Sequence, residues 1–134
     1  EDMKGFNTNI EQGTVENSDF RRVLYTGKHS QLVLMSLQPK EEIGLETHLE
    51  NDQFLRFEGG HGAVFIDDNR YEVRDGDAVI VPAGARHNVV NLSDTEKLRL
   101  YTIYSPPHHI DGTVHPTKEA AEANDEEYDG KTTE

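Results

Sequence analysis

Short apolar runs, rich in β-branched and aromatic residues, recur along the chain and are separated by polar turns. The turns use Gly, Pro, Asp and Asn, as at 67–69 and 75–76, and these residues favour tight reversals of direction. No sustained helical period precedes Lys118. Many short strands with frequent turns predict an all-β sandwich or small barrel. The runs cover residues 23–25, 32–37, 54–57, 63–66, 78–81, 89–92 and 98–104.

The length of 134 residues suits one domain with a single modest core. We expect one domain over 1–134, with a compact barrel at about 5–105, a C-terminal extension at 106–118 and an acidic tail at 119–134. The tail holds seven acidic residues against one lysine, a net charge of −6. Apart from a helical fragment around Lys118–Ala123, this composition predicts that residues from Glu119 onward are mobile and dispensable for the fold.

The net charge of −13 at pH 7 makes the chain strongly acidic. Such a surface repels phosphate groups, so we expect neither nucleic acid nor an anionic membrane as a partner. There are no cysteines, which excludes disulfides, thiolate metal ligands and a cysteine nucleophile. No apolar run approaches membrane-spanning length. A reducing compartment is compatible with this composition, and we expect a cytoplasmic protein.

Residues 76–91, GDAVIVPAGARHNVVN, combine an apolar strand, a tight turn and a histidine that opens the next strand. Pro82 and Gly84 suit the turn, because Pro restricts φ and Gly tolerates conformations that other residues avoid. Gly76, Pro82, Gly84, His87 and Asn91 match the pattern G-x5-P-x-G-x2-H-x3-N at all five positions. This stretch resembles the second motif of the cupin superfamily. The resemblance covers roughly residues 30–105 and implies a double-stranded β-helix, jelly-roll-like barrel, commonly a homodimer.

The first cupin motif, G-x5-H-x-H-x3-4-E-x6-G, is matched only in part. Glu46 stands at the first histidine position, His48 matches the second, Gln53 replaces the glutamate, and Gly60 matches the closing glycine. Lys40 stands where the motif opens with glycine. The chain is most similar to the small single-domain cupins described as mannose-6-phosphate-isomerase-like, many of which have no assigned substrate.

Glu46 and His48 are two residues apart, so they share one face of a strand but not of a helix. The turn-like residues 50–52 let Gln53 begin an antiparallel return strand opposite His48. With His87 from the second motif, these side chains can form a metal-ligand set of two histidines, a glutamate and a glutamine. Cupins ordinarily use three histidines and one glutamate. Here the single carboxylate has moved to Glu46, and the charge of the ligand set is unchanged.

Two imidazoles and two oxygen donors suit Mn²⁺ or Fe²⁺, and also Ni²⁺, Co²⁺ or Zn²⁺. In an octahedron two positions then stay open for water or substrate. The alternative interpretation is a polar-lined barrel without metal, in which Glu46 and His48 pair with each other. No dedicated general base is evident, so the catalytic residues remain unassigned.

Further side chains are candidates for the lining of the pocket. Leu55 and Phe57 follow Gln53 on the inner face, and of Tyr101 and Tyr104 at most one faces inward; we assign Tyr101. His108 is expected near the pocket mouth, in a segment that also contains His109 and His115. These three histidines could instead form a second metal site, whereas His29 and His61 are expected on the surface.

Three classes of function follow from the resemblance. The first is a metal-dependent isomerase, decarboxylase or lyase acting on a small oxygenated metabolite, such as a sugar or a keto or hydroxy acid, with the metal as Lewis acid. The second is an Fe²⁺-dependent dioxygenase. The third is a small-molecule binding or sensing module without turnover. The fold alone does not decide among them.

Overall fold

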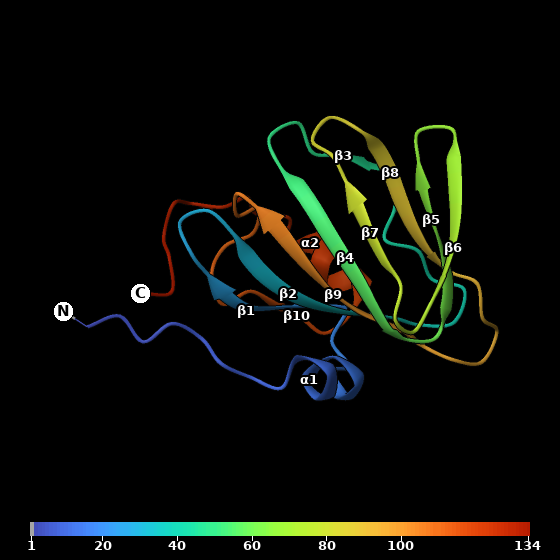
Figure 1. Cartoon of the computed structure of the whole chain (residues 1–134), viewed down its shortest axis with the longest axis horizontal. Coiled ribbons are helices and arrows are strands. Elements are labelled where there is room, and N and C mark those ends of the chain that lie inside the picture. The colour runs from blue at the N-terminus through green and yellow to red at the C-terminus, as the bar shows by residue number, and fades with distance from the viewer. Residues whose placement is uncertain (1) are drawn as a thin grey trace.

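Two antiparallel β-sheets face one another in the computed structural model, which describes residues 2–134 (Figure 1). The strands are β1 (Arg21–Thr26), β2 (Gln31–Leu37), β3 (Glu46–Thr47), β4 (Asp52–Gly59), β5 (His61–Ile66), β6 (Asn69–Arg74), β7 (Ala78–Val81), β8 (Arg86–Asn91), β9 (Leu98–Ser105) and β10 (Val114–His115). The two helices are α1 (Ile10–Glu16) and α2 (Lys118–Ala123). One sheet has the order β10-β1-β2-β9-β4-β7 and the other β3-β8-β5-β6. The predicted double-stranded β-helix is confirmed.

The hydrophobic core lies between the inner faces of the sheets. Along β9 every second residue from Leu98 to Tyr104 is buried, while the residues between them are partly exposed. Leu55 and Phe57 on β4 are fully buried in the same core, as expected for inward positions. The period of two in the sequence therefore separates an apolar interior from the outer surfaces.

Asn91, which closes the second motif, joins the end of β2 to the β8–β9 connection from inside the fold. It is fully buried. Its Nδ2 lies 3.1, 3.0 and 2.9 Å from the carbonyl oxygens of Leu37, Gln38 and Glu96, and its Oδ1 accepts from the Ser93 amide at 3.0 Å. A side-chain amide offers two donors and an acceptor with two lone pairs, so both ends of this group are used. The role of Asn91 is structural.

Lys40 occupies the place of the opening glycine of the first motif and adopts the backbone conformation that glycine favours. Its φ is +64°, in the left-handed region. The Lys40 ammonium donates to the carbonyl of Leu92 at 2.8 Å and lies 3.4 Å from Asp94. The turn is therefore kept without the glycine.

One short helix precedes Lys118, which corrects the expectation of none. The Asn9 side chain caps α1 by accepting from the Gln12 amide at 3.0 Å. The helix has seven residues, including Gly13 and Val15, which have modest helix propensity. Two turns of such a sequence produce no sustained period, and tertiary packing stabilises them.

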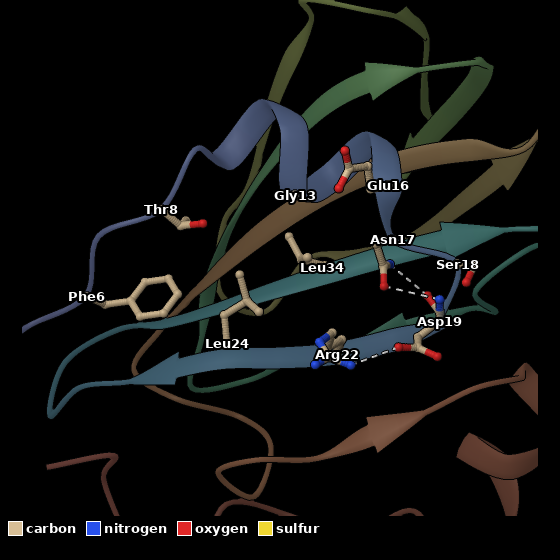
Figure 2. A pocket seen from close by; sticks show the side chains of 10 residues that line it. All are labelled: Phe6, Thr8, Gly13, Glu16, Asn17, Ser18, Asp19, Arg22, Leu24 and Leu34. Atoms are coloured by element: carbon tan, nitrogen blue, oxygen red, sulfur yellow. Dashed lines mark hydrogen bonds and ion pairs between the residues drawn. The ribbon is translucent and has the colours of Figure 1, made fainter.

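Helix α1 packs on the outer side of the six-stranded sheet, near β2, β4 and β9. Arg99 on β9 donates to the carbonyl of Asn17, just after the helix. A surface groove of about 320 Å³ runs beside α1 above Leu24 and Leu34 (Figure 2). The groove also contains Arg22, whose guanidinium lies 3.3 Å from Asp19. It lies on the opposite side of the sheet from the core.

The C-terminal residues pack against the barrel, which corrects the expectation of a mobile tail. Ala121 on α2 is 5% exposed and belongs to the hydrophobic core. Thr133 exchanges hydrogen bonds with Thr26, at 2.9 Å from its amide to the Thr26 carbonyl and 2.8 Å from the Thr26 amide to its hydroxyl. The Glu134 carboxylate accepts from the Tyr25 hydroxyl at 2.5 Å. The net charge of the tail did not predict this packing, because one small apolar side chain and a few individual hydrogen bonds hold the segment.

Replacing Ala121 with Asp tests whether α2 stabilises the fold. The new carboxylate would be buried without a partner, which costs about 2 kcal/mol or more, so we expect a melting temperature lower by about 5 °C or more. Ala123→Asp is the matched control, because Ala123 is exposed on the same helix. Thermal denaturation followed by circular dichroism measures both. Equal melting temperatures for the two variants, or no loss on deleting 118–134, would show that the segment is dispensable.

Candidate metal centre

Strands β3 and β8 bring the two motifs together. In their antiparallel pairing Glu46 lies directly opposite His87. His48 follows Glu46 by two residues and projects to the same side. The second-motif turn is attached here, since the Gly84 amide donates to the His48 carbonyl at 2.9 Å. Gly84 has a φ of +90°, which explains the glycine at this position.

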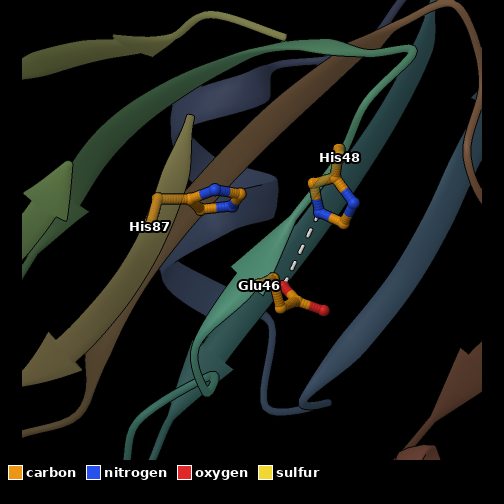
Figure 3. Close-up of side chains that lie close together, drawn as sticks. All are labelled: Glu46, His48 and His87. Atoms are coloured by element: carbon orange, nitrogen blue, oxygen red, sulfur yellow. Dashed lines mark ion pairs between the residues drawn. The ribbon is translucent and has the colours of Figure 1, made fainter. Parts of the chain in front are cut away.

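The side chains of Glu46, His48 and His87 converge inside the barrel (Figure 3). One ligand atom from each lies within 4.8 Å of the others, and His48 Nε2 lies 3.7 Å from Glu46 Oε1. His48 is 8% exposed and His87 3%, whereas the Glu46 side chain is 37% exposed. Three of the four predicted ligands therefore meet in a group that could hold a metal ion.

The protonation of the cluster suits metal binding. Burial, reinforced by the charge of His48, lowers the pKa of His87, so its imidazole stays neutral. His87 Nδ1 lies 3.2 Å from the Ala85 carbonyl, which makes Nδ1 the protonated nitrogen and leaves the Nε2 lone pair for a ligand. Burial opposes the ionisation of Glu46, but the interaction with the His48 side chain, followed by the charge of Arg21, outweighs it and lowers the pKa of Glu46. At neutral pH, Glu46 is therefore an ionised carboxylate and the His87 imidazole is neutral.

Gln53 lies on the inner face of β4, where its register partners are Tyr104 and Val81. Its Nε2 donates to the Thr102 hydroxyl at 3.0 Å. Its Oε1 is buried and has no hydrogen-bond partner, and the same is true of His48 Nε2. Orphaned buried acceptors are rare in folded proteins because each costs desolvation energy. A cation held by Glu46, His48 and His87 would give His48 Nε2 a partner, so the residues present fit a metal ion. Gln53, whose register partner Tyr104 packs against His48, offers a further oxygen on the same inner face.

The inward tyrosine is Tyr104, not Tyr101, which corrects the assignment of Tyr101 to the pocket. The Tyr104 ring lies 5.8 Å from that of His48 in an edge-on arrangement. Tyr101 faces the outer side of the sheet, with its ring 6.2 Å from Phe54. Burial raises the pKa of Tyr104, so the phenol keeps its proton. The spacing of three excluded one of the two tyrosines, but the choice required the register of β9.

His108 lies beside the cluster, as expected, with its ring centroid 4.2 Å from that of His48. It is held there by Gln31, which is 1% exposed. Gln31 Oε1 accepts from the amides of His108 and His109 at 3.1 and 2.9 Å. Gln31 Nε2 donates to the His109 carbonyl at 2.7 Å and the Thr26 hydroxyl at 2.9 Å. Both donors and both lone pairs of the amide are used.

The other histidines of the C-terminal extension are buried but form no second metal cluster within residues 2–134. His109 Nε2 lies 3.4 Å from the Tyr104 hydroxyl, and His115 Nδ1 lies 3.4 Å from Arg21 Nη1. Arg21 was missed altogether, because β1 was recognised only from the apolar run 23–25. Extending its period of two backwards would have placed Arg21 inward with Val23.

The buried His109 should make the protein acid-sensitive. Burial, followed by the charge of Arg21, lowers the pKa of His109 to about 2, whereas the unfolded chain has a value of about 6.5. Stability is complete above the unfolded value and is lost as the pH falls below it, because only the unfolded state takes up the proton. Between pH 7 and pH 5 the loss from His109 is about 2 kcal/mol.

Urea denaturation at pH 7 and pH 5 measures this loss. His109→Gln should remove about 2 kcal/mol of the difference between the two pH values. His29→Gln is the control, because His29 is exposed in the β1–β2 turn. The same pH dependence in parent and His109→Gln would exclude His109 as the source.

Comparison with known proteins agrees with the sequence motifs. The chain is 48% identical over 126 residues to the uncharacterized protein YrkC of Bacillus subtilis, covering 90% of this chain and 67% of that protein. The crystal structure of BH2720 from Bacillus halodurans matches with a TM-score of 0.87 and 47% identity, covering 90% of this chain and 96% of the other. A predicted oxalate decarboxylase from Thermotoga maritima, 20% identical with a TM-score of 0.55, covers 59% of this chain and 68% of its own and shows a shared fold.

The family assignment rests on these relatives and on a direct match to a family model. Within residues 2–134 no helix is long and apolar enough to cross a membrane. The narrower mannose-6-phosphate-isomerase-like subtype stays a prediction. The model of the cupin domain matches residues 33–104, more than half of the chain and including both motifs. The chain belongs to the cupin family.

Proposed function

We propose that Glu46, His48, Gln53 and His87 bind a divalent metal ion and that the centre serves a reaction of a small oxygenated metabolite. Isomerisation, decarboxylation and lyase-type elimination are the reaction types that suit such a centre. The observation that carries the proposal is the convergence of Glu46, His48 and His87, together with two buried atoms that lack a hydrogen-bond partner, His48 Nε2 and Gln53 Oε1. A hydrogen-bonded Glu46–His48 pair without metal would satisfy His48 Nε2 but would leave Gln53 Oε1 without a partner.

The bound ion, of Mn²⁺, Fe²⁺, Ni²⁺, Co²⁺ or Zn²⁺ type, would supply Lewis acidity toward a carbonyl or carboxylate oxygen. The protein's own groups orient and enclose the reactants. The Ala85 carbonyl fixes the His87 ring, and Glu46 supplies the only carboxylate of the ligand set. Tyr104 presents a protonated phenol to the interior, and its buried surroundings exclude bulk water.

A second candidate function follows from the ligand types. Two histidines and one carboxylate with open positions are also the set used by non-haem Fe²⁺ oxygenases. Oxygen consumption by Fe²⁺-loaded protein in the presence of a keto or hydroxy acid would favour this function. Turnover with Zn²⁺, which has no redox chemistry, would favour the first. Binding without product would indicate a sensing module.

We also propose that the protein is cytoplasmic and that it forms the homodimer expected from the sequence. Strands β6 and β7 end the two sheets on one side, and Tyr71 and Ile80 there are 49% and 65% exposed. An exposed strand edge with apolar side chains favours pairing with another chain. Sedimentation equilibrium should give twice the chain mass, and Ile80→Lys should shift the equilibrium to monomer. A monomeric parent protein would contradict the proposal.

Removing the carboxylate gives the sharpest test of the metal centre. Glu46→Gln leaves a divalent ion among neutral ligands, so Mn²⁺ affinity should fall by about an order of magnitude or more while the fold is kept. Gln53→Glu should retain Mn²⁺, since it adds an anion in the ligand set. His48→Ala and His87→Ala should each weaken binding by losing a ligand. Calorimetric titration with Mn²⁺ and elemental analysis of protein purified without added metal measure these effects.

Glu72→Gln is the matched control, because Glu72 forms a comparable Glu–His pair with His61 on the surface, at 3.1 Å. Its Mn²⁺ affinity should equal that of the parent. If Glu46→Gln binds Mn²⁺ as tightly as the parent, Glu46 is not a ligand and the centre is a two-histidine site.

A further inference from the structure

Arg21 places a guanidinium inside the barrel, where charged groups are rare. It lies on β1, opposite His115 of β10 on one side and Met35 of β2 on the other. It is 8% exposed, whereas the next residue, Arg22, is exposed on the outer surface. The alternation along β1 therefore sends two adjacent arginines to opposite sides of the sheet.

This guanidinium has no acidic partner. Within residues 2–134 no carboxylate oxygen lies within 4.0 Å of Arg21. Its Nη1 lies 3.4 Å from His115 Nδ1, and its buried Nε has no hydrogen-bond partner. A buried charge without a counter-ion carries a large desolvation cost, and arginine cannot avoid it by deprotonation. The guanidinium is therefore buried without a direct ion pair, and the Glu46 carboxylate acts on it only through space.

The histidines next to Arg21 add no positive charge of their own. Burial, followed by the charge of Arg21, lowers the pKa values of His109 and His115, so both imidazoles are neutral. Neutral His115 can accept from the guanidinium and hold it in place. Lys118 is a second cation at this cleft, but only the arginine fork matches the two oxygens of a carboxylate.

Arg21 and Glu46 line the same cleft, between β1, the segment leading to β3, and α2. The cleft has a volume of about 100 Å³ and is also lined by Phe20, Ile43, Lys118, Ala121, Glu122 and Asp125. It therefore joins the unpaired guanidinium to the candidate metal centre. Its volume is below the roughly 300 Å³ at which ordinary ligand pockets begin, so it suits a short acid and not an oligosaccharide.

We propose that Arg21 binds the carboxylate of a short-chain hydroxy or keto acid whose neighbouring oxygen reaches the centre formed by Glu46, His48 and His87. This inference rests on the proposed function and narrows its substrate class from oxygenated metabolites in general to small carboxylic acids. Neutral sugars have no group that could neutralise Arg21. Arg21 is a specificity-determining residue and not a metal ligand.

Binding of glycolate and of its neutral amide, glycolamide, tests the proposal. Binding of both compounds is measured by ligand-observed NMR with the full chain, once with metal-free protein and once with protein loaded with Zn²⁺. Mn²⁺ is not used here, because it is paramagnetic. Glycolate should bind and glycolamide should bind at least about tenfold more weakly, because a charge-assisted pair contributes about a tenfold to hundredfold difference. Arg21→Gln should lower glycolate affinity by the same factor, and Arg21→Lys, which keeps the charge but not the fork, should lower it less.

Arg22→Gln is the matched control, with the same loss of charge one residue away, and should bind glycolate like the parent. Circular dichroism establishes that each variant is folded, and Arg21→Lys serves if Arg21→Gln does not fold. Equal binding of glycolate by the parent and the folded Arg21 variants would overturn the proposal. Tighter binding of inorganic phosphate than of glycolate would overturn the carboxylate assignment.

The two proposals fail in different ways. Zn²⁺ titration without any acid tests the metal centre alone, and Arg21→Gln should still bind Zn²⁺, because it keeps all the proposed ligands. If the parent binds no Zn²⁺, the proposed function fails, while glycolate binding to the metal-free protein still decides the role of Arg21. If Zn²⁺ binds and glycolate does not depend on Arg21, only the further inference fails.

Discussion

The pairing of β3 with β8 is the constraint on which the site depends. Strand β3 has only two residues, so its own ladder contributes little, yet it sets Glu46 opposite His87. The second-motif turn reinforces it, because the Gly84 amide binds the His48 carbonyl and the Ala83 amide binds the Asp52 carboxylate at 2.9 Å. A shift of one residue would turn these side chains to the other face. The turn thus fixes the register that creates the cluster.

Buried polar groups in this fold are of two kinds. Asn91 has partners at both ends of its amide and serves to join loops. His48, Gln53 and Arg21 each have a buried nitrogen or oxygen without a partner, and all three lie on inner faces of the barrel. Ser36, Arg56 and Glu58 also have such atoms, but His48 and Arg21 lie next to Glu46, and a ligand held there would offset the cost of burying them.

The barrel and most of its candidate ligands could be predicted from the sequence, because motif spacing and a period of two report directly on strands and faces. Residues with local signals, such as His87 and His48, fell where expected. Tyr104 and Arg21 could not be assigned, because their positions depend on register and on a strand start hidden by polar residues. The packing of α2 through Ala121 was also not evident, because burial of one small side chain leaves little trace in composition.

The Gln31 amide has a consequence for how small molecules enter and leave the interior. Its four hydrogen bonds hold the segment that carries His108 against the end of the barrel, and no donor or acceptor remains free for another arrangement. Such a fully paired buried network rigidifies the wall that contains it. The segment therefore cannot move away from the barrel without breaking the three bonds that join Gln31 to His108 and His109. The cleft beside α2, which Arg21 and Glu46 line, then offers an approach to the centre that does not disturb this wall.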